Sequence, residues 1–135
     1  MDCLFCKIAH EKIAAQVVYE DDNHLAFLDI NPVTKGHTLV IPKKHADNFS
    51  QLSNQEAKEL AGKVHQIARP LVQALGAEGY NLGMNNGPVA GQIIDHVHWH
   101  IIPRYGNDNL HLWQRSDYEA DLLDQTFEKL QGKIK

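Results

Sequence analysis

The chain has 135 residues, of which 43% are hydrophobic and 22% are charged, so we predict a single soluble domain over residues 1–135. The formal net charge of −4, with neutral histidines, argues against a protein that binds nucleic acid by neutralising its phosphates. No run approaches the roughly 20 apolar residues of a membrane span, and the first residues do not resemble a signal peptide, so we expect a cytoplasmic protein with no membrane partner.

The first part of the chain is predicted to form a short helix and three strands. The helix is expected around Phe5–Ala9. Alternating or β-branched residues then predict strands at Gln16–Glu20, His24–Asp29 and His37–Ile41. The composition of Asp21-Asp22-Asn23 is typical of a tight turn, which indicates that the first two strands form a hairpin.

A long amphipathic helix is predicted to follow. Ser53 and Glu56 match the capping box, so the helix should begin near Ser53. Apolar residues recur at helical spacing as far as Leu75, and Gly76 is a suitable end. Pro70 lies inside this pattern, where it removes a backbone hydrogen bond. We therefore predict a kink there or an early end of the helix.

The last part of the chain is predicted to contain two strands, Tyr80–Asn85 and Asp95–Pro103, and a helix over Tyr118–Gln131. The apolar side chains of this helix should face inward: Leu122, Leu123, Phe127 and Leu130. Strands, one long helix, more strands and a final helix predict an α+β fold with a five-stranded antiparallel sheet.

Three histidines stand two residues apart in the last predicted strand, at His96, His98 and His100. Alternate residues of a strand share one face, so the imidazoles should lie on one side, roughly 7 Å apart. The other side should face the core and carries Val97, Trp99 and Ile101. The residues alone leave four interpretations open. These are a histidine-rich strand without chemistry, a catalytic metal site, nucleophilic catalysis, and a division in which one histidine binds a structural metal.

Two cysteines near the N-terminus, Cys3 and Cys6, have the spacing of zinc ligands. The same spacing occurs in redox pairs, although no βαβ pattern surrounds it here. A third interpretation is a pair of free, partly buried thiols.

The segment from His96 to Ile102 resembles the motif of the histidine triad (HIT) family, in which His-x-His-x-His is followed by two apolar residues. Five further segments resemble the family in order and spacing: Cys3–Ile8, Leu25–Ile30, Gly36–His45, Asn85–Gly87 and Ala90–Gln92. The ending Ile102–Gly106 and the paired cysteines are similar to the bacterial-type branch, near the Hint-like nucleoside phosphoramidases.

This resemblance implies a nucleotide-binding hydrolase that acts on the α-phosphate of nucleoside 5′-phosphoramidates or related nucleoside monophosphate derivatives. His98 would attack phosphorus and form a nucleotidyl-histidine intermediate. His100 would contact the phosphate or the leaving group and help to deliver its proton. His37 would reach the phosphate from the neighbouring strand.

The resemblance also implies a set of nucleotide-binding residues. Gln92 and the backbone around Gly91 would hold the α-phosphate oxygens, and Asn85 would bind near the phosphate or ribose. Asp29 would accept hydrogen bonds from the ribose hydroxyls. The apolar slot for the base would be formed by Phe5, Ile8, Phe27, Leu28 and Ile30. Ile93 departs from relatives that carry Ser or Thr at its position, which puts proton delivery and substrate choice in doubt.

By the same resemblance, a structural zinc would be bound by Cys3, Cys6, His45 and His96. No catalytic cofactor is expected, and the protein should be a homodimer. Two other functions stay open: a dinucleoside polyphosphate hydrolase, and a nucleotide-binding, zinc-containing interaction module without turnover.

Overall fold

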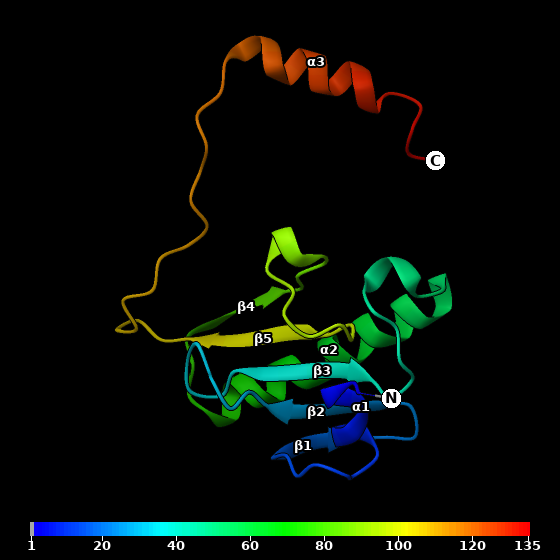
Figure 1. Cartoon of the computed structure of the whole chain (residues 1–135). Coiled ribbons are helices and arrows are strands. Elements are labelled where there is room, and N and C mark those ends of the chain that lie inside the picture. Colours follow the sequence, from blue (N-terminus) through cyan, green and yellow to red (C-terminus); the bar gives the residue numbers. More distant parts are fainter. Residues whose placement is uncertain (1) are drawn as a thin grey trace.

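The computed structural model, which describes residues 2–135, contains a five-stranded antiparallel sheet and three α-helices (Figure 1). The strands are β1 (Val17–Glu20), β2 (His24–Leu28), β3 (Thr38–Pro42), β4 (Gly79–Gly83) and β5 (Trp99–Arg104). They lie in the order β1-β2-β3-β5-β4. The helices are α1 (Leu4–Ala9), α2 (Asn54–Ala74) and α3 (Ala120–Leu130), with short 3-10 turns η1 (Phe49–Gln51) and η2 (Pro88–Ala90). The predicted α+β architecture is confirmed.

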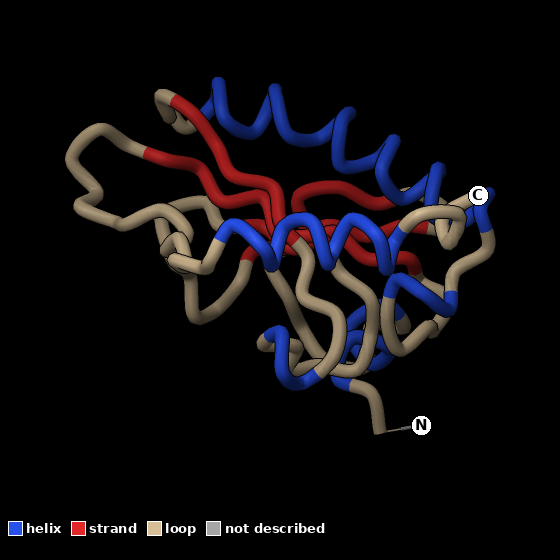
Figure 2. Tube along the Cα trace, turned by 90° about the horizontal axis from the view of Figure 1, so that it is seen from above, coloured by secondary structure: helices blue, strands red, loops and turns tan. Residues whose placement is uncertain are grey.

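Helices cover both faces of the sheet, with α2 on one face and α1 on the other (Figure 2). Neighbouring residues of β2 and β3 therefore supply two separate core layers. The layer under α2 contains Ala26, Val40, Leu60, Val64, Ile67, Ala68, Val97 and Ile101. The layer under α1 contains Phe5, Leu25, Phe27, Leu39 and Ile41. The predicted core positions Val97 and Ile101 are confirmed, and Trp99 packs half-buried against the first layer.

The predicted capping box begins α2. The Ser53 hydroxyl accepts a hydrogen bond from Glu56 N at 3.1 Å, and the Glu56 carboxylate accepts one from Ser53 N at 2.9 Å. The helix continues through Pro70 to Ala74, so the predicted early end is wrong. Pro70 lies near the C-terminal end of α2, where the cap still forms because Leu75 N donates to Leu71 O. No helix within residues 2–135 combines the length and apolarity that crossing a membrane requires.

The histidine segment is less regular than predicted. β5 begins at Trp99, so His96 and His98 lie before the strand and only His100 lies within it. The cause is a hydrogen bond from Val97 N to Ala46 O, 2.8 Å long, which attaches this segment to a loop instead of to the sheet. The three imidazoles therefore do not form one equivalent row and occupy separate environments.

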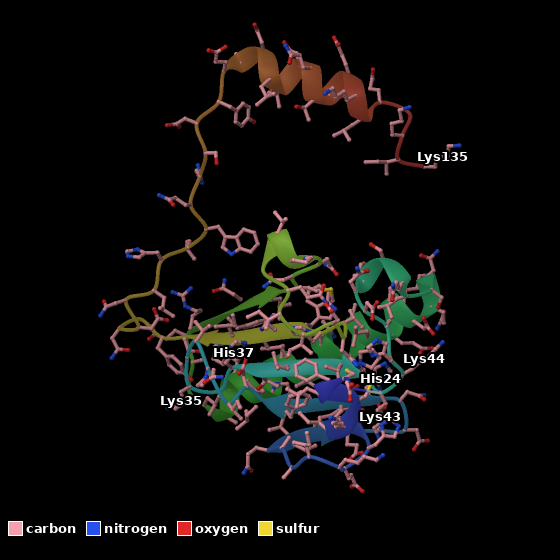
Figure 3. The ribbon with its side chains drawn as sticks, in the orientation of Figure 1. His24, Lys35, His37, Lys43, Lys44 and Lys135 are labelled. Carbon is pink, nitrogen blue, oxygen red and sulfur yellow. The ribbon has the colours of Figure 1, made fainter. Side chains whose placement is uncertain are left out.

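The predicted inward face of the last helix is wrong. α3 forms within the predicted range, but none of its residues is buried, and Phe127 is 61% exposed. An extended segment carries the helix away from the rest of the chain (Figure 1). Its side chains stand clear of the sheet and the other helices (Figure 3).

Replacing Gly36 with alanine is expected to destabilise the fold by about 2–5 kcal/mol. Gly36 has φ +90°, and a Cβ there would collide with Leu75 Cδ1 and lie 3.3 Å from Pro103 Cγ. Left-handed backbone costs an alanine about 1–2 kcal/mol, and overpacking adds about 1–3 kcal/mol. Urea unfolding measures the change. In the matched control Gly62→Ala, a helical site with nothing within 4 Å, stability should instead increase. Equal effects of the two substitutions would contradict this account.

Candidate functional site

A cavity of about 430 Å³ lies between α1, the end of β2 and the loop before β5. His98 and His100 both line it. So do most of the residues predicted to bind a nucleotide: Phe5, Ile8, Phe27, Leu28, Asp29, Ile30, Asn85 and Gly91. The lining is mainly apolar, and the histidines and Asp29 are the ionisable side chains in it. The fold therefore brings together segments that are up to 96 residues apart in the sequence, from Leu4 to His100.

The His98 imidazole is held in one tautomer. Its side chain is 7% exposed, and Nδ1 lies 2.7 Å from His96 O. A carbonyl oxygen only accepts hydrogen bonds, so Nδ1 carries the hydrogen and Nε2 keeps its lone pair. Burial lowers the pKa of His98, which favours the neutral ring. The Phe5 ring packs edge-on against it, with centroids 5.2 Å apart. His98 therefore presents a neutral, oriented nucleophilic nitrogen.

A second chain of hydrogen bonds fixes His37 and His100. Val33 N donates to His37 Nδ1 at 3.0 Å, so a neutral His37 carries its hydrogen on Nε2. That nitrogen lies 2.8 Å from His100 Nδ1 and donates to it. His100 consequently carries its hydrogen on Nε2. The His98 and His100 rings lie 4.9 Å apart, which places a lone pair and an N–H donor side by side in the cavity.

Burial sets the charge of this cluster. Desolvation lowers the pKa of His37 and lowers that of His100 to about 4, with the neighbouring imidazoles adding to the shift in His100. Asp29 opposes the shift, since its Oδ2 lies 3.7 Å from His37 Nε2. The Asp29 Oδ1 accepts a hydrogen bond from Asn31 N at 2.8 Å, which orients the carboxylate at the edge of the cavity. The lowered pKa values of His37, His98 and His100 favour uncharged imidazoles at neutral pH.

Acidification is expected to destabilise the protein between pH 6.5 and pH 4. The pKa of His100 is about 4 in the folded protein and near 6.5 when unfolded, so the unfolded chain binds the proton first. Stability is complete above pH 6.5 and falls by up to about 1.4 kcal/mol per pH unit for this histidine. Urea unfolding across this range checks the slope. His100→Asn should have a shallower slope than the wild type, and identical slopes would contradict the assignment.

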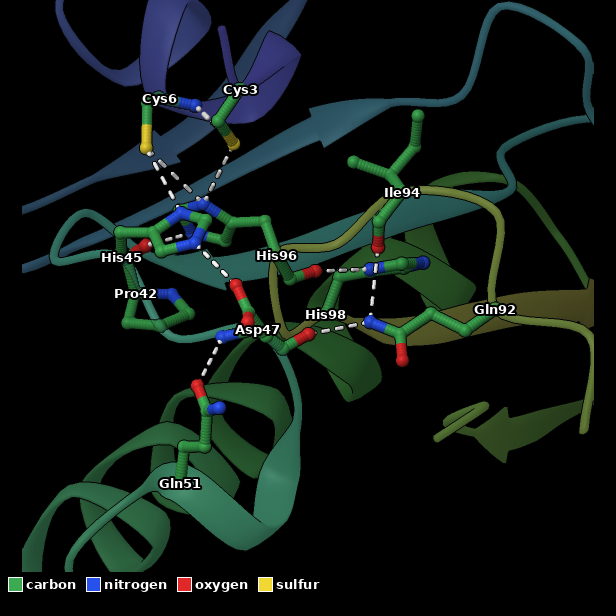
Figure 4. A network of polar contacts seen from close by, with 10 residues as sticks. All are labelled: Cys3, Cys6, Pro42, His45, Asp47, Gln51, Gln92, Ile94, His96 and His98. Atoms are coloured by element: carbon green, nitrogen blue, oxygen red, sulfur yellow. Dashed lines mark hydrogen bonds and ion pairs between the residues drawn. The ribbon is translucent and has the colours of Figure 1, made fainter. Parts of the chain in front are cut away.

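Gln92 and Gly91 occupy a tight loop. Gln92 Nε2 donates to Asp47 O and to Ile94 O (Figure 4). Gln92 Oε1 accepts a hydrogen bond from Gly87 N at 2.9 Å. The Gln92 side chain does not line the cavity in this structure, unlike Gly91, whose φ is +92°. Gln92 is therefore placed to hold the loop, and its predicted contact with phosphate stays a prediction. Ile93 lines the cavity and is 89% exposed.

The predicted metal ligands Cys3, Cys6, His45 and His96 form one cluster beside the cavity (Figure 4). Their four ligand atoms all lie within 4.8 Å of one another. Cys3 Sγ lies 3.3 Å from His96 Nδ1, and Cys6 Sγ lies 3.3 Å from His45 Nδ1. The remote nitrogens donate outward, His96 Nε2 to Pro42 O and His45 Nε2 to the Asp47 carboxylate.

These outward hydrogen bonds decide which nitrogens can bind a metal. Each leaves a lone pair on Nδ1, on the side that faces the thiols. A carboxylate or carbonyl behind a metal-binding histidine is the usual supporting arrangement. Two thiols and two imidazoles are a donor set that suits zinc. The residues therefore fit a closed, four-coordinate site.

Asp29, His37 and His100 form another group whose ligand atoms are close enough for a metal ion. The hydrogen bonds argue against that use. His37 Nδ1 accepts from Val33 N, so His37 Nε2 carries a hydrogen and has no free lone pair. This group is better suited to hydrogen bonding than to metal binding.

Some residues that build the site were missed at the sequence level. Val33 and Pro42 act through backbone atoms, which leave no signal in a side-chain pattern. Asp47 could have been found, because it follows His45 by two residues and carboxylates commonly support metal-binding histidines. Further cavity residues outside the predicted set are Leu4, Ile13, Ala14, Ala15, Asn31, Leu39 and Ile94.

Comparisons with known proteins agree with this geometry. The adenosine 5′-monophosphoramidase of Schizosaccharomyces pombe is 38% identical over 138 residues, covering 100% of both chains. The crystal structure of a HIT family protein from Bacillus subtilis matches with a TM-score of 0.88 and 40% identity, covering 100% of this chain, the α3 region included, and 99% of that one. A zinc-bound histidine triad family protein of Mycobacterium smegmatis matches with a TM-score of 0.78 and 36% identity over 98% of each chain. The HIT domain family model matches residues 10–107, and this chain therefore belongs to the HIT family.

Proposed function

We propose that this protein hydrolyses nucleoside 5′-phosphoramidates, or closely related nucleoside monophosphate derivatives, through a nucleotidyl intermediate on His98. One observation carries the proposal. The tautomer of His98 is set by His96 O, which leaves a nucleophilic Nε2 on a ring that lines a mainly apolar cavity. The phosphoramidase of Schizosaccharomyces pombe, which aligns over the whole chain, supports the substrate class.

The reaction divides into two displacements at the α-phosphorus. In the first, the His98 Nε2 lone pair forms a bond to phosphorus, the P–N bond of the substrate breaks, and the amine leaves with a proton. In the second, water attacks phosphorus, the bond to His98 breaks, and the nucleoside monophosphate is released. The proton that water loses balances the one that the amine gained. His100, with its hydrogen on Nε2, is the group placed to move that proton.

The remaining cavity residues fit the rest of a nucleotide. A carboxylate only accepts hydrogen bonds, so Asp29 suits the two hydroxyls of a ribose. The apolar walls around Phe5, Phe27 and Leu28 suit a flat base. The exposed Ile93 offers no hydroxyl to a leaving group, which favours amines that gain their proton through His100.

We also propose that Cys3, Cys6, His45 and His96 bind a structural zinc ion. The donor set and the two outward hydrogen bonds of the histidines support it. When bound, zinc would attach α1 to the segment that carries His98. The chemical steps at phosphorus use the histidines and water.

The decisive experiment combines turnover with trapping of the intermediate. Purified protein is mixed with adenosine 5′-phosphoramidate, quenched within milliseconds and digested, and the peptides are examined by mass spectrometry. An adenylyl group on His98, together with release of AMP, is the expected result. Turnover without any adduct would favour a different nucleophile, and neither turnover nor adduct would favour an interaction module. Faster cleavage of diadenosine triphosphate than of the phosphoramidate would favour a dinucleoside polyphosphate hydrolase.

A further inference from the structure

Cys3 and Cys6 are the two cysteines of the chain, and both sulfurs point toward His45 and His96 from the start of α1 (Figure 4). Cys3 caps the helix, and its Sγ accepts a hydrogen bond of 3.3 Å from Cys6 N. Both sulfurs belong to the group of ligand atoms that lie within 4.8 Å of one another. Rotation of the two side chains would bring the sulfurs to a disulfide distance of about 2.05 Å. The pair is therefore placed for disulfide formation as well as for metal binding.

The two thiols differ in their exposure. Cys3 is half-buried, whereas Cys6 is buried and only 7% exposed. An oxidant in solution therefore meets Cys3 first, and Cys6 lies beside it to attack the modified sulfur. An accessible cysteine next to a resolving cysteine is the usual arrangement of a redox-sensitive pair.

The helix that carries the cysteines also forms a wall of the nucleotide cavity, through Phe5 and Ile8. The Phe5 ring packs edge-on against His98 and Phe27, with centroids 5.2 and 5.3 Å apart. α1 has only six residues, a length at which an isolated helix is unstable in water. Its position therefore depends on its attachments to the rest of the domain, and the cysteines lie at its first turn.

His96 connects the cysteine pair to the nucleophile by a second route. Its Nδ1 lies 3.3 Å from Cys3 Sγ and 3.5 Å from Cys6 Sγ. Its backbone oxygen, at the same time, holds Nδ1 of His98 at 2.7 Å. A change at the sulfurs therefore reaches His98 through the His96 backbone as well as through Phe5.

We propose that Cys3 and Cys6 form a thiol–disulfide switch, in which a low-molecular-weight disulfide oxidises the pair, expels zinc and loosens α1. The inference rests on the zinc site proposed above. A thiolate binds zinc, and a disulfide sulfur does not provide one. Oxidation would leave the two histidines as the remaining ligands, too few for a structural zinc site.

The oxidation divides into two exchange steps. Cys3 Sγ attacks one sulfur of the oxidant, so that a mixed disulfide forms and the first thiolate leaves. Cys6 Sγ then attacks the Cys3 sulfur, the mixed disulfide breaks, and the second thiolate leaves. Two electrons pass from the cysteine pair to the oxidant, and the two released thiolates take protons from water. The zinc ion leaves as Zn²⁺, with its oxidation state unchanged.

Oxidation of the zinc-loaded full chain with oxidised glutathione tests the switch. The chromogenic chelator 4-(2-pyridylazo)resorcinol reports released zinc, while acid quenching, alkylation and mass spectrometry identify the state of each cysteine. The expected result is release of one zinc ion for each Cys3–Cys6 disulfide formed. Dithiothreitol followed by zinc should restore the starting state. Reduced glutathione is the control and should release no zinc.

Hydrogen exchange measures the effect on the helix. Amides of α1 should exchange at least about tenfold faster in the oxidised protein than in the zinc-loaded protein, because the ion no longer stabilises their position. Amides of α2 provide the internal reference and should exchange at unchanged rates. Unchanged exchange in α1 would overturn the proposed loosening.

Two variants test the order of the steps. Cys6→Ser should keep glutathione attached to Cys3, because the resolving thiol is missing. Cys3→Ser should react at least about tenfold more slowly, since its remaining thiol is buried.

The outcomes separate this switch from the proposals on which it builds. Zinc-loaded wild-type protein that stays reduced, that stops at a mixed disulfide, or that forms the disulfide without losing zinc would overturn the switch alone. Reduced protein that binds no zinc would refute the zinc site and the switch together. Turnover of a phosphoramidate is not a readout here, so a failure of the proposed catalysis would leave these results unaffected.

Discussion

Replacing His98 with alanine is expected to lower kcat for a nucleoside phosphoramidate by about four orders of magnitude or more, as for other catalytic nucleophiles. The substitution removes the nitrogen that would bond to phosphorus, while the cavity walls stay in place. Substrate binding should change much less than kcat, because Asp29 and the apolar lining are untouched. The loss should therefore be in chemistry and not in affinity.

Steady-state kinetics and equilibrium binding of AMP measure the two effects separately. His65→Ala is the matched control, since His65 is an exposed histidine on α2, outside the cavity. It should retain wild-type turnover. If His98→Ala retained full turnover, or if it abolished AMP binding as strongly as catalysis, the nucleophile assignment would be wrong.

Removal of zinc is expected to lower the melting temperature by about 10 °C or more. A ligand present at a thousand times its Kd stabilises the folded state by about 4 kcal/mol, which corresponds to a shift of this size for a domain of this length. Without the ion, the two thiols meet the imidazoles only as weak hydrogen-bonding partners, with Cys3 Sγ 3.3 Å from His96 Nδ1 and Cys6 Sγ 3.3 Å from His45 Nδ1. The N-terminal segment with α1 should loosen first, because it carries both cysteines.

Asp47→Asn tests the zinc site without removing a ligand. Asp47 accepts a hydrogen bond from His45 Nε2 at 2.7 Å, and loss of such a partner typically weakens metal affinity by about 10–100-fold. Competition with a chromogenic chelator measures the affinity, and Asp22→Asn, at an exposed turn, is the control. Equal zinc affinities in Asp47→Asn and the wild type would contradict the assignment. If stripping the metal abolished activity and adding zinc restored it at once without refolding, a catalytic metal would replace the mechanism proposed above.

Local sequence signals predicted most of the secondary structure correctly. The capping box at Ser53 and Glu56 begins α2, and the Asp21 turn forms because its carboxylate accepts hydrogen bonds from Asn23 N and His24 N. Such signals depend on residues a few positions apart, so they are readable from a single sequence. The exceptions are instructive, since β5 starts only at Trp99 and α2 passes through Pro70. For β5 the outcome depends on a distant contact, the hydrogen bond from Val97 N to Ala46 O. For α2 it depends on the place of Pro70 near the end of the helix, where the last turn still closes.

The candidate site divides in the same way. Its residue types could be named from the sequence, because the histidine segment, the cysteine pair and Asp29 resemble a known motif arrangement. The tautomer of each histidine could not be predicted from the sequence. His98, His96 and His37 receive their tautomers from three backbone groups, at His96, Pro42 and Val33, which any side-chain pattern leaves invisible. The position of Gln92 likewise depends on carbonyl groups from two separate loops.

Short-range spacing and residue type are enough to predict which segments fold into helices and strands and which side chains are available for chemistry. How those side chains are used depends on contacts between segments that lie far apart in the chain. Folding buries the histidines, which keeps them neutral, and it sets their lone pairs through backbone partners distant in the chain. It also left α3 outside the core despite a regular apolar pattern. Such a pattern identifies the face of a helix that can be buried, but not the surface against which that face packs.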